Sequence, residues 1–160
     1  MSISRDNMIS MIRKHTITGS TIALLLLLVL TQLPACSRQP VYPPAAQNGA
    51  YIAIDPAGLE PAVPVFHTYH YQGKNISYFV FKDHDRVFAF FDACAGCYRH
   101  KRGYRYDDGD VICRYCSQKF PISRLEKGLG SCYPIRLGGW MENGKYLIPL
   151  SALESAANQF

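Results

Sequence analysis

From Tyr51 onward, the middle of the chain consists of short apolar runs, separated by polar turn residues, that are typical of β-strands. Runs of β-branched and aromatic residues occupy positions 51–54, 65–71, 76–82 and 87–91. Turn-forming residues separate these runs, which predicts tight connections between consecutive strands. The sequence therefore predicts a mainly β, small α+β fold, in which an antiparallel β meander leads directly into Cys94.

Two more elements are expected near the end of the chain. The apolar run 146–149 predicts a closing strand. Pro149 places that strand at a sheet edge, because proline donates no backbone hydrogen bond. Ser151 and Glu154 have the spacing of a capping box, which predicts a short C-terminal helix from about Ala152.

Residues 1–35 have the pattern of a lipoprotein signal peptide. A basic pair precedes an apolar run at 22–30, which is shorter than the roughly 20 residues of a membrane-spanning helix. Leu33-Pro34-Ala35-Cys36 resembles a lipobox, which predicts lipidation of Cys36; an uncleaved N-terminal anchor is the alternative. Both interpretations place the domain outside the cytoplasm on a membrane, and Ser37 favours the outer membrane if the cell has two.

Residues 36–49 are expected to form the lipidated end and a Pro-rich, semi-rigid tether, followed by one domain at 50–160. The formal net charge of +5 falls to +3 without residues 1–35. Such a mild excess does not predict a nucleic-acid partner. No acid–base pair, nucleophile triad or phosphate loop is recognisable, so electron transfer or metal binding is favoured over hydrolase or transferase activity.

Two Cys-x-x-Cys pairs, Cys94/Cys97 and Cys113/Cys116, are separated by fifteen residues. This is the spacing of a four-thiolate metal site, because each tight turn aims two sulfurs at one point. We therefore expect a zinc-ribbon-like lobe. The spacing leaves three alternatives open: a structural zinc, iron as a single ion or an iron–sulfur cluster, and a pair of disulfides.

Cys132 exceeds the number of thiols that a four-thiolate site needs. It is a candidate fifth ligand, a nearby thiol for ligand exchange or disulfide chemistry, or a buried structural cysteine. The stretch between the pairs is rich in cations, which either form a solvated hairpin, offset the negative charge of thiolates or dock an acidic partner. These cations are Arg99, Lys101, Arg102 and Arg105.

Several motifs follow one another in a defined order: Phe91-Asp92-Ala93-Cys94-x-x-Cys97, Gly103-Tyr104, Cys113-x-x-Cys116, Phe120-Pro121-Ile122 and Gly130-x-Cys132-x-Pro134. Over roughly residues 50–150, this combination resembles the membrane iron–sulfur protein FtrD-like family. The resemblance implies a membrane-associated domain that binds iron or an iron–sulfur cluster beside an iron permease or redox partner protein. The ligand positions that it implies are Cys94, Cys97, Cys113, Cys116 and Cys132. Ser117 stands where the family usually has glycine.

The combined expectation is an extracytoplasmic, lipid-anchored metal-binding protein that transfers electrons in iron acquisition at the membrane. Export of an unfolded chain keeps zinc as the alternative metal, because cluster assembly is normally cytoplasmic. Two other functions remain open from the sequence. One is a binding module that zinc only stabilises, and the other is a thiol–disulfide oxidoreductase using Cys132.

Overall fold

The computed structural model describes residues 39–127 and 132–160. The predicted signal peptide, the lipobox and Cys36 therefore lie outside the described residues. The described residues form one unit by their internal contacts. Within the described part of the chain, no helix has both the length and the apolar character needed to cross a bilayer.

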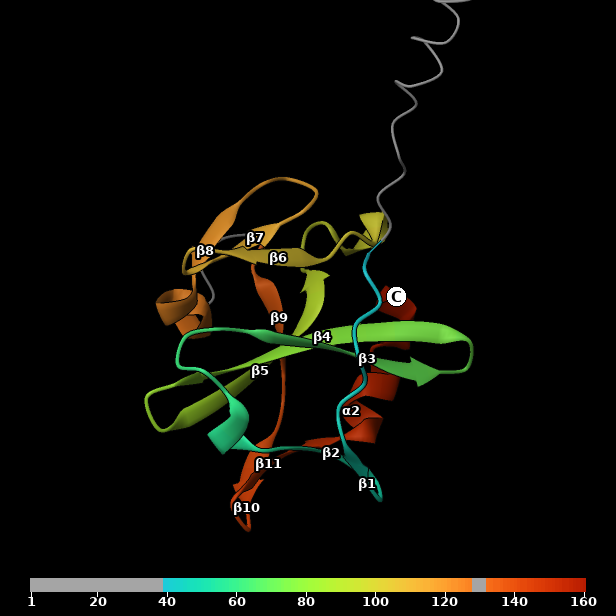
Figure 1. The fold of residues 1–160 in the computed structure, drawn as a ribbon. Helices are drawn as coiled ribbons and strands as arrows, with labels where there is room; N and C mark the ends of the chain where they lie inside the picture. The colour runs from blue at the N-terminus through green and yellow to red at the C-terminus, as the bar shows by residue number, and fades with distance from the viewer. Residues whose placement is uncertain (1–38, 128–131) are drawn as a thin grey trace, which may run out of the picture. The chain divides into compact units, whose positions relative to one another are not determined.

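The central sheet carries the predicted meander (Figure 1). Its strand order is β3–β4–β5–β9, and all neighbouring pairs are antiparallel. The strands are β3 (Val65–Tyr71), β4 (Lys74–Asp83), β5 (Arg86–Cys94) and β9 (Pro134–Leu137). Residues 76–81 of β4 are all buried, because other parts of the chain cover both faces of this sheet.

A second antiparallel sheet has the order β1–β2–β11–β10. It is formed by β1 (Gln47–Asn48), β2 (Tyr51–Ile54), β10 (Trp140–Glu142) and β11 (Lys145–Pro149). The single α-helix that is described, α2 (Leu150–Ser155), follows β11 directly. Ile52, Ile148 and Leu153 share one core with Tyr78 and Val80 from the central sheet. Burial of these side chains, at roughly 2 kcal/mol each, stabilises this side of the fold.

A smaller sheet, β6–β7–β8, packs on the other face of the central sheet. Its strands are β6 (Tyr104–Asp107), β7 (Asp110–Cys113) and β8 (Lys119–Pro121). Tyr104 links the two layers, since its ring meets Phe79 edge-on at 6.3 Å and Phe120 at 6.4 Å between centroids. Short 3-10 turns complete the chain: η1 (Pro56–Gly58), η2 (Tyr98–His100), η3 (Ile122–Lys127) and η4 (Ala157–Gln159).

The mainly β fold, the meander and the short C-terminal helix are confirmed, but two details are wrong. β11 lies between β2 and β10 rather than at an edge. Pro149 is tolerated there because it pairs only with Tyr51, and β10 pairs no further along β11 than Leu147. The capping box is also absent: α2 begins at Leu150, and no side chain caps it.

The described part of the predicted tether lies on the central and second sheets. The backbone N–H of Tyr42 donates to the Oγ1 atom of Thr68 at 2.9 Å, and the Tyr42 ring lies 5.0 Å from that of Phe66. β1 then pairs with β2. Residues 39–48 therefore belong to the folded unit rather than to a free spacer, and they are called the docked segment below.

Candidate metal centre

Three segments of the chain carry the five described cysteines to one end of the central sheet (Figure 1). Cys94 is the last residue of β5, and Cys97 follows in the turn before η2. Cys113 ends β7, and Cys116 lies in the turn that leads to β8. Cys132 precedes β9, whose Pro134 pairs with Cys94 beyond an irregularity in the β5–β9 register. Strand pairing thus brings Cys132 beside the first pair.

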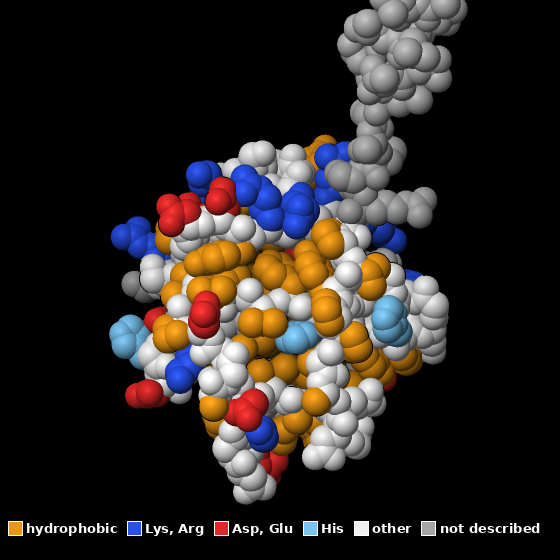
Figure 2. Space-filling model, viewed as in Figure 1, with side chains coloured by type: hydrophobic (Ala, Val, Ile, Leu, Met, Phe, Trp, Pro, Cys, Tyr) orange, Lys and Arg blue, Asp and Glu red, His pale blue; other side chains and the backbone are white. Residues whose placement is uncertain are grey.

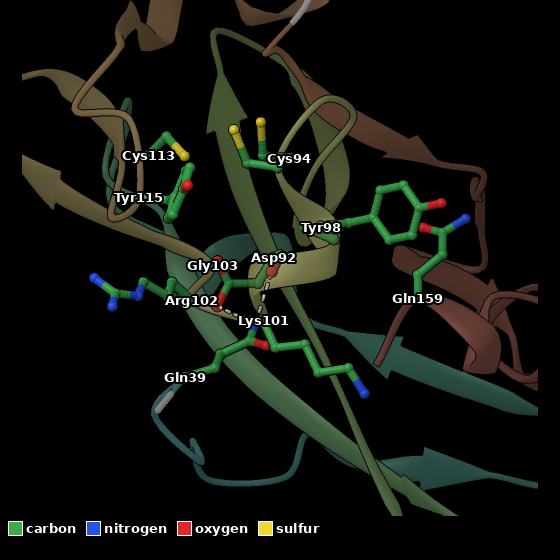
Figure 3. A pocket seen from close by; sticks show the side chains of 12 residues that line it. Gln39, Asp92, Cys94, Tyr98, Lys101, Arg102, Gly103, Cys113, Tyr115 and Gln159 are labelled. Atoms are coloured by element: carbon green, nitrogen blue, oxygen red, sulfur yellow. Dashed lines mark hydrogen bonds between the residues drawn. The ribbon is translucent and has the colours of Figure 1, made fainter. Parts of the chain in front are cut away.

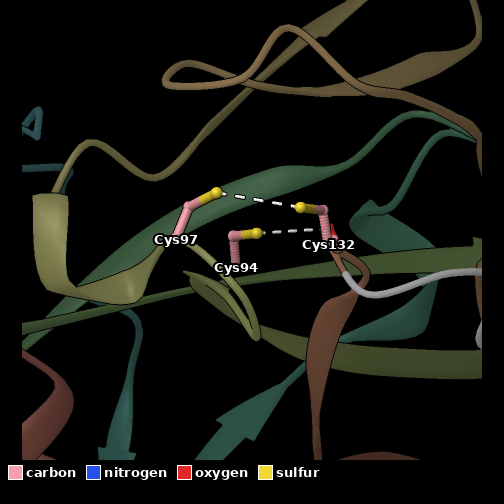
Figure 4. A group of neighbouring side chains, drawn as sticks. All are labelled: Cys94, Cys97 and Cys132. Carbon is pink, nitrogen blue, oxygen red and sulfur yellow. Dashed lines mark hydrogen bonds between the residues drawn. The ribbon is translucent and has the colours of Figure 1, made fainter.

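The sulfur atoms form two groups of three that share Cys97. Within each group, all Sγ atoms lie within 4.8 Å of one another. The groups are Cys94, Cys97, Cys132 and Cys97, Cys113, Cys116. Figure 4 shows the first group, in which the Sγ atoms of Cys97 and Cys132 are 3.7 Å apart. A tetrahedral ion with sulfur ligands at about 2.3 Å sets neighbouring sulfurs about 3.8 Å apart, so this spacing suits thiolate coordination.

All five cysteines predicted from the sequence are therefore brought together, as free thiols. The two histidines of β3 belong to neither group. The Nδ1 atom of His67 lies 3.1 Å from the Pro43 carbonyl oxygen, and that of His70 lies 2.7 Å from Asn75 Oδ1. These histidines support the docked segment and a hairpin instead.

Burial differs across the cluster. Cys94 and Cys113 are buried, Cys97 and Cys132 are half-buried, and Cys116 is exposed. Burial raises the pKa of Cys113 to about 11, and burial also raises the pKa of Cys97 and of Cys132. For Cys116, burial is outweighed by hydrogen bonds from the Gln118 backbone and from neighbouring thiols, so its pKa is lowered. Metal binding to such a set displaces thiol protons.

Tyr104 connects the backbone segments that carry the cysteines. It is fully buried and pairs with Cys113 across β6 and β7. Its hydroxyl donates to the Cys132 carbonyl oxygen at 2.9 Å, and Cys94 Sγ donates to the same oxygen at 3.3 Å. Burial and the nearby thiols of Cys94 and Cys113 raise the pKa of Tyr104 well above its ordinary value of 10.0. The phenol therefore stays protonated and keeps its hydrogen bond.

Asp92 joins the site to the N-terminal segment and to the small sheet (Figure 3). Its carboxylate accepts hydrogen bonds from the backbone N–H of Tyr104 at 2.5 Å and from Gln39 Nε2 at 2.8 Å. Gln39 Nε2 also donates to the Asp92 backbone carbonyl at 2.6 Å. Burial raises the pKa of Asp92 to about 6, against the lowering effect of these donors.

Gly103 permits this contact. Its φ is +64°, and a Cβ at this position would lie 2.5 Å from Asp92 Oδ2. The sequence marks Gly103 as a turn residue and Asp92 only as part of a motif, and the contact between them was not predicted. An acidic residue two positions before the first metal-site cysteine and a glycine before Tyr104 were the available signals. Ser117 has a φ of +60°, in the left-handed region that glycine adopts more readily than serine.

Aromatic and basic side chains cover the outer edge of the cluster. The ring of Tyr115, between Cys113 and Cys116, stacks on His100 with centroids 3.5 Å apart, and Arg102 lies over the Tyr115 ring at 5.8 Å. Figure 2 shows Lys and Arg side chains gathered at the end of the molecule that carries β6–β8. The exposed cations beside the cysteines, here called the basic collar, are Arg99, Lys101, Arg102, Arg105 and Arg114.

The fold and this cluster define a small β protein with a cysteine-rich candidate metal centre. The family described as "Membrane iron-sulfur containing protein FtrD-like" matches residues 60–160, and the chain belongs to this family. No curated protein matches the chain. The family description indicates membrane association, and together with the cysteine cluster it indicates metal binding.

Proposed function

We propose that this protein is an extracytoplasmic electron-transfer protein, anchored to the membrane through a lipid on Cys36 and acting in iron acquisition. Its iron or iron–sulfur centre is held by Cys94, Cys97, Cys113, Cys116 and Cys132. The observation that carries the proposal is the convergence of two thiol groups on the shared Cys97. Thiolates are the usual protein ligands of iron–sulfur clusters, and the family description names such a cluster.

The residues present suit such a group. A thiolate-held iron or iron–sulfur centre supplies a redox couple whose potential depends on charge, hydrogen bonding and solvent exposure. Cys94 and Cys113 hold the protected side, where Tyr104 and Phe120 exclude water. Cys116 is exposed and gives the centre an edge near the surface, where a redox partner can approach.

The proposed domain organisation places a signal peptide at 1–35 and the metal-binding domain after the lipidated Cys36. The docked segment supports a short connection between the two. Gln39 is the third residue after Cys36, and its side chain donates hydrogen bonds to Asp92. Asp92 lies two residues before Cys94, the first cysteine of the site. An anchor at Cys36 therefore holds the cysteine cluster at the membrane, within reach of a permease or another redox partner protein.

A second function is favoured by one distance. The Cys97 and Cys132 sulfurs are 3.7 Å apart, close enough for these thiols to form a disulfide after a small movement. In a thiol–disulfide oxidoreductase, this pair would be oxidised as a disulfide substrate is reduced to two thiols.

The same sulfur spacing also suits a structural zinc ion, which would stabilise the fold without transferring electrons.

Anaerobic purification of the full chain from membranes separates these functions. The metal content per chain is measured together with the visible absorption spectrum before and after dithionite reduction. The proposal predicts iron in the protein and visible absorption that bleaches reversibly. Colourless protein with one zinc per chain supports the structural module, and metal-free protein with a titratable Cys97–Cys132 disulfide supports the oxidoreductase; either result refutes the proposal.

A further inference from the structure

Four of the five cations of the basic collar lie on one short stretch, residues 99–105, that itself contains no acidic residue. No Asp or Glu occurs between positions 93 and 106, whereas Arg99, Lys101, Arg102 and Arg105 do. Arg105 pairs with Asp107 at 2.9 Å, and Arg114 Nε donates to the Tyr104 carbonyl at 2.7 Å. Within the described residues, the other three form no ion pair, and all three are exposed.

The described chain begins beside the backbone segment that carries this collar, between η2 and β6 (Figure 1). The backbone N–H of Gln39 donates to the Lys101 carbonyl oxygen at 3.2 Å, and the Gln39 side chain is bonded to Asp92. Three residues of fully extended chain, from Cys36 to Gln39, span at most roughly 11 Å. A lipid on Cys36 therefore requires the collar to lie near the headgroups to which the lipid is bound.

We propose that the basic collar is a docking surface for anionic phospholipid headgroups. This inference rests on the proposed function for the anchor at Cys36, and adds the orientation of the cysteine centre on the membrane. Each Lys or Arg close to an anionic bilayer contributes about 1 kcal/mol of attraction, so three unpaired cations are sufficient to orient an anchored domain. An acidic protein could meet the same charges, but it would not require the collar to adjoin the start of the docked segment.

Docking would fix which edge of the cluster faces the membrane. Arg102 lies over the Tyr115 ring and His100 stacks on it, and Tyr115 belongs to the turn that carries Cys116. The collar therefore brings the exposed Cys116 edge to the headgroup layer. From there it can reach a partner embedded in the bilayer rather than a freely diffusing one.

The test measures amide hydrogen exchange of the full chain on vesicles. One set is made of phosphatidylcholine alone, and the other contains phosphatidylglycerol as well. Sedimentation with the neutral vesicles reports the anchor, and exchange of residues 98–105 reports the collar. We expect these amides to be protected on the anionic vesicles relative to the neutral ones. The protection should disappear in about 1 M salt, where the Debye length is roughly 3 Å.

Two matched double variants remove the same charge from different places. Arg99→Gln with Lys101→Gln should lower the docking equilibrium roughly 30-fold, the equivalent of two charges at about 1 kcal/mol each. Lys82→Gln with Lys145→Gln changes β4 and β11 instead, and should leave the protection intact. Loss of protection in both variants would contradict docking through the collar.

Equal exchange on both vesicle types overturns the inference. Protection of residues 98–105 by polyglutamate, but not by anionic vesicles, also overturns it and indicates that the collar binds an acidic protein instead. If the full chain fails to sediment with neutral vesicles, the anchor of the proposed function is refuted. Sedimentation with phosphatidylglycerol vesicles then tests the collar by itself, and its failure there refutes the inference too.

Discussion

The Sγ atoms of Cys97 and Cys132 lie 3.7 Å apart although the two residues are 35 positions apart in the chain. Pairing of β9 with β5 brings the two sulfurs together, because it places Pro134 opposite Cys94. The backbone N–H of Ala95 also donates to the Tyr133 carbonyl at 3.1 Å. Cys132 is thus part of the thiol cluster through sheet pairing, independently of the two Cys-x-x-Cys turns.

Replacement of Cys97 should damage the centre more than replacement of any other described cysteine, since Cys97 alone belongs to both thiol groups. We expect Cys97→Ser to lower metal affinity on the order of tenfold more than Cys116→Ser, whose side chain lies at the exposed edge. Competition with a chelator, followed by metal analysis, measures the difference. Equal losses in the two variants would argue against a shared ligand.

Gly103→Ala should destabilise the protein by about 3 kcal/mol or more, because the new Cβ would press on the buried Asp92 carboxylate as well as strain the backbone. Gly109→Ala is the matched control. Its φ of +83° is also positive, but nothing lies within 4 Å of its Cβ position, so a cost of about 1 kcal/mol is expected. Denaturant unfolding gives both values, and similar costs would exclude the Asp92 contact.

Gln39→Ala should release the N-terminal segment from the site. It removes two hydrogen bonds to Asp92 and leaves that buried carboxylate with less compensation, at a cost of about 1–3 kcal/mol. Gln47→Ala, at an exposed position in β1, should change stability by less than about 0.5 kcal/mol. Proteolysis near residue 39 and denaturant unfolding report the change. A segment that is equally protected in both variants would show that Gln39 does not hold it.

Two buried groups should make stability depend on pH in opposite directions: below about pH 6.5 the contribution of His67 falls, whereas that of Asp92, whose pKa is raised to about 6, grows. Burial lowers the pKa of His67 from its ordinary 6.5, and the hydrogen bond with Pro43 offsets only part of this effect. The unfolded chain therefore binds the proton more readily, so the contribution of His67 is complete above the unfolded pKa and falls through the folded one. The free energy of unfolding of the wild type minus that of His67→Gln should therefore decrease from about pH 7.5 to pH 5, because the Asp92 contribution is the same in both proteins. An unchanged slope in this variant would contradict the assignment.

Local sequence signals predicted the strands well. The dense β-branched and aromatic run 65–71 gave β3 with the observed bounds, and the turn residues after it marked the β3–β4 hairpin. The Cys-x-x-Cys spacing predicted the convergence of Cys94, Cys97, Cys113 and Cys116, because each turn confines its two sulfurs. These features depend on residues close together in the chain, and a sequence displays them directly.

Features that depend on tertiary pairing were missed. The rule that proline marks an edge strand failed for β11, because the ladder with β10 ends before Pro149 is reached. The Pro-rich composition of the tether hid its docking, which arises from single contacts of Gln39, Tyr42 and Pro43 with distant residues. The support that Asp92 receives through Gly103 likewise needs the central and small sheets together.

X-ray absorption spectroscopy at the metal edge of the full chain, purified anaerobically, tests the central claim most directly. A centre built by the converging thiols predicts an iron edge with a first shell of sulfur, which is depleted in Cys97→Ser. A zinc edge would contradict the proposed redox function. An iron shell of oxygen and nitrogen that is unchanged by Cys97→Ser would contradict the site itself.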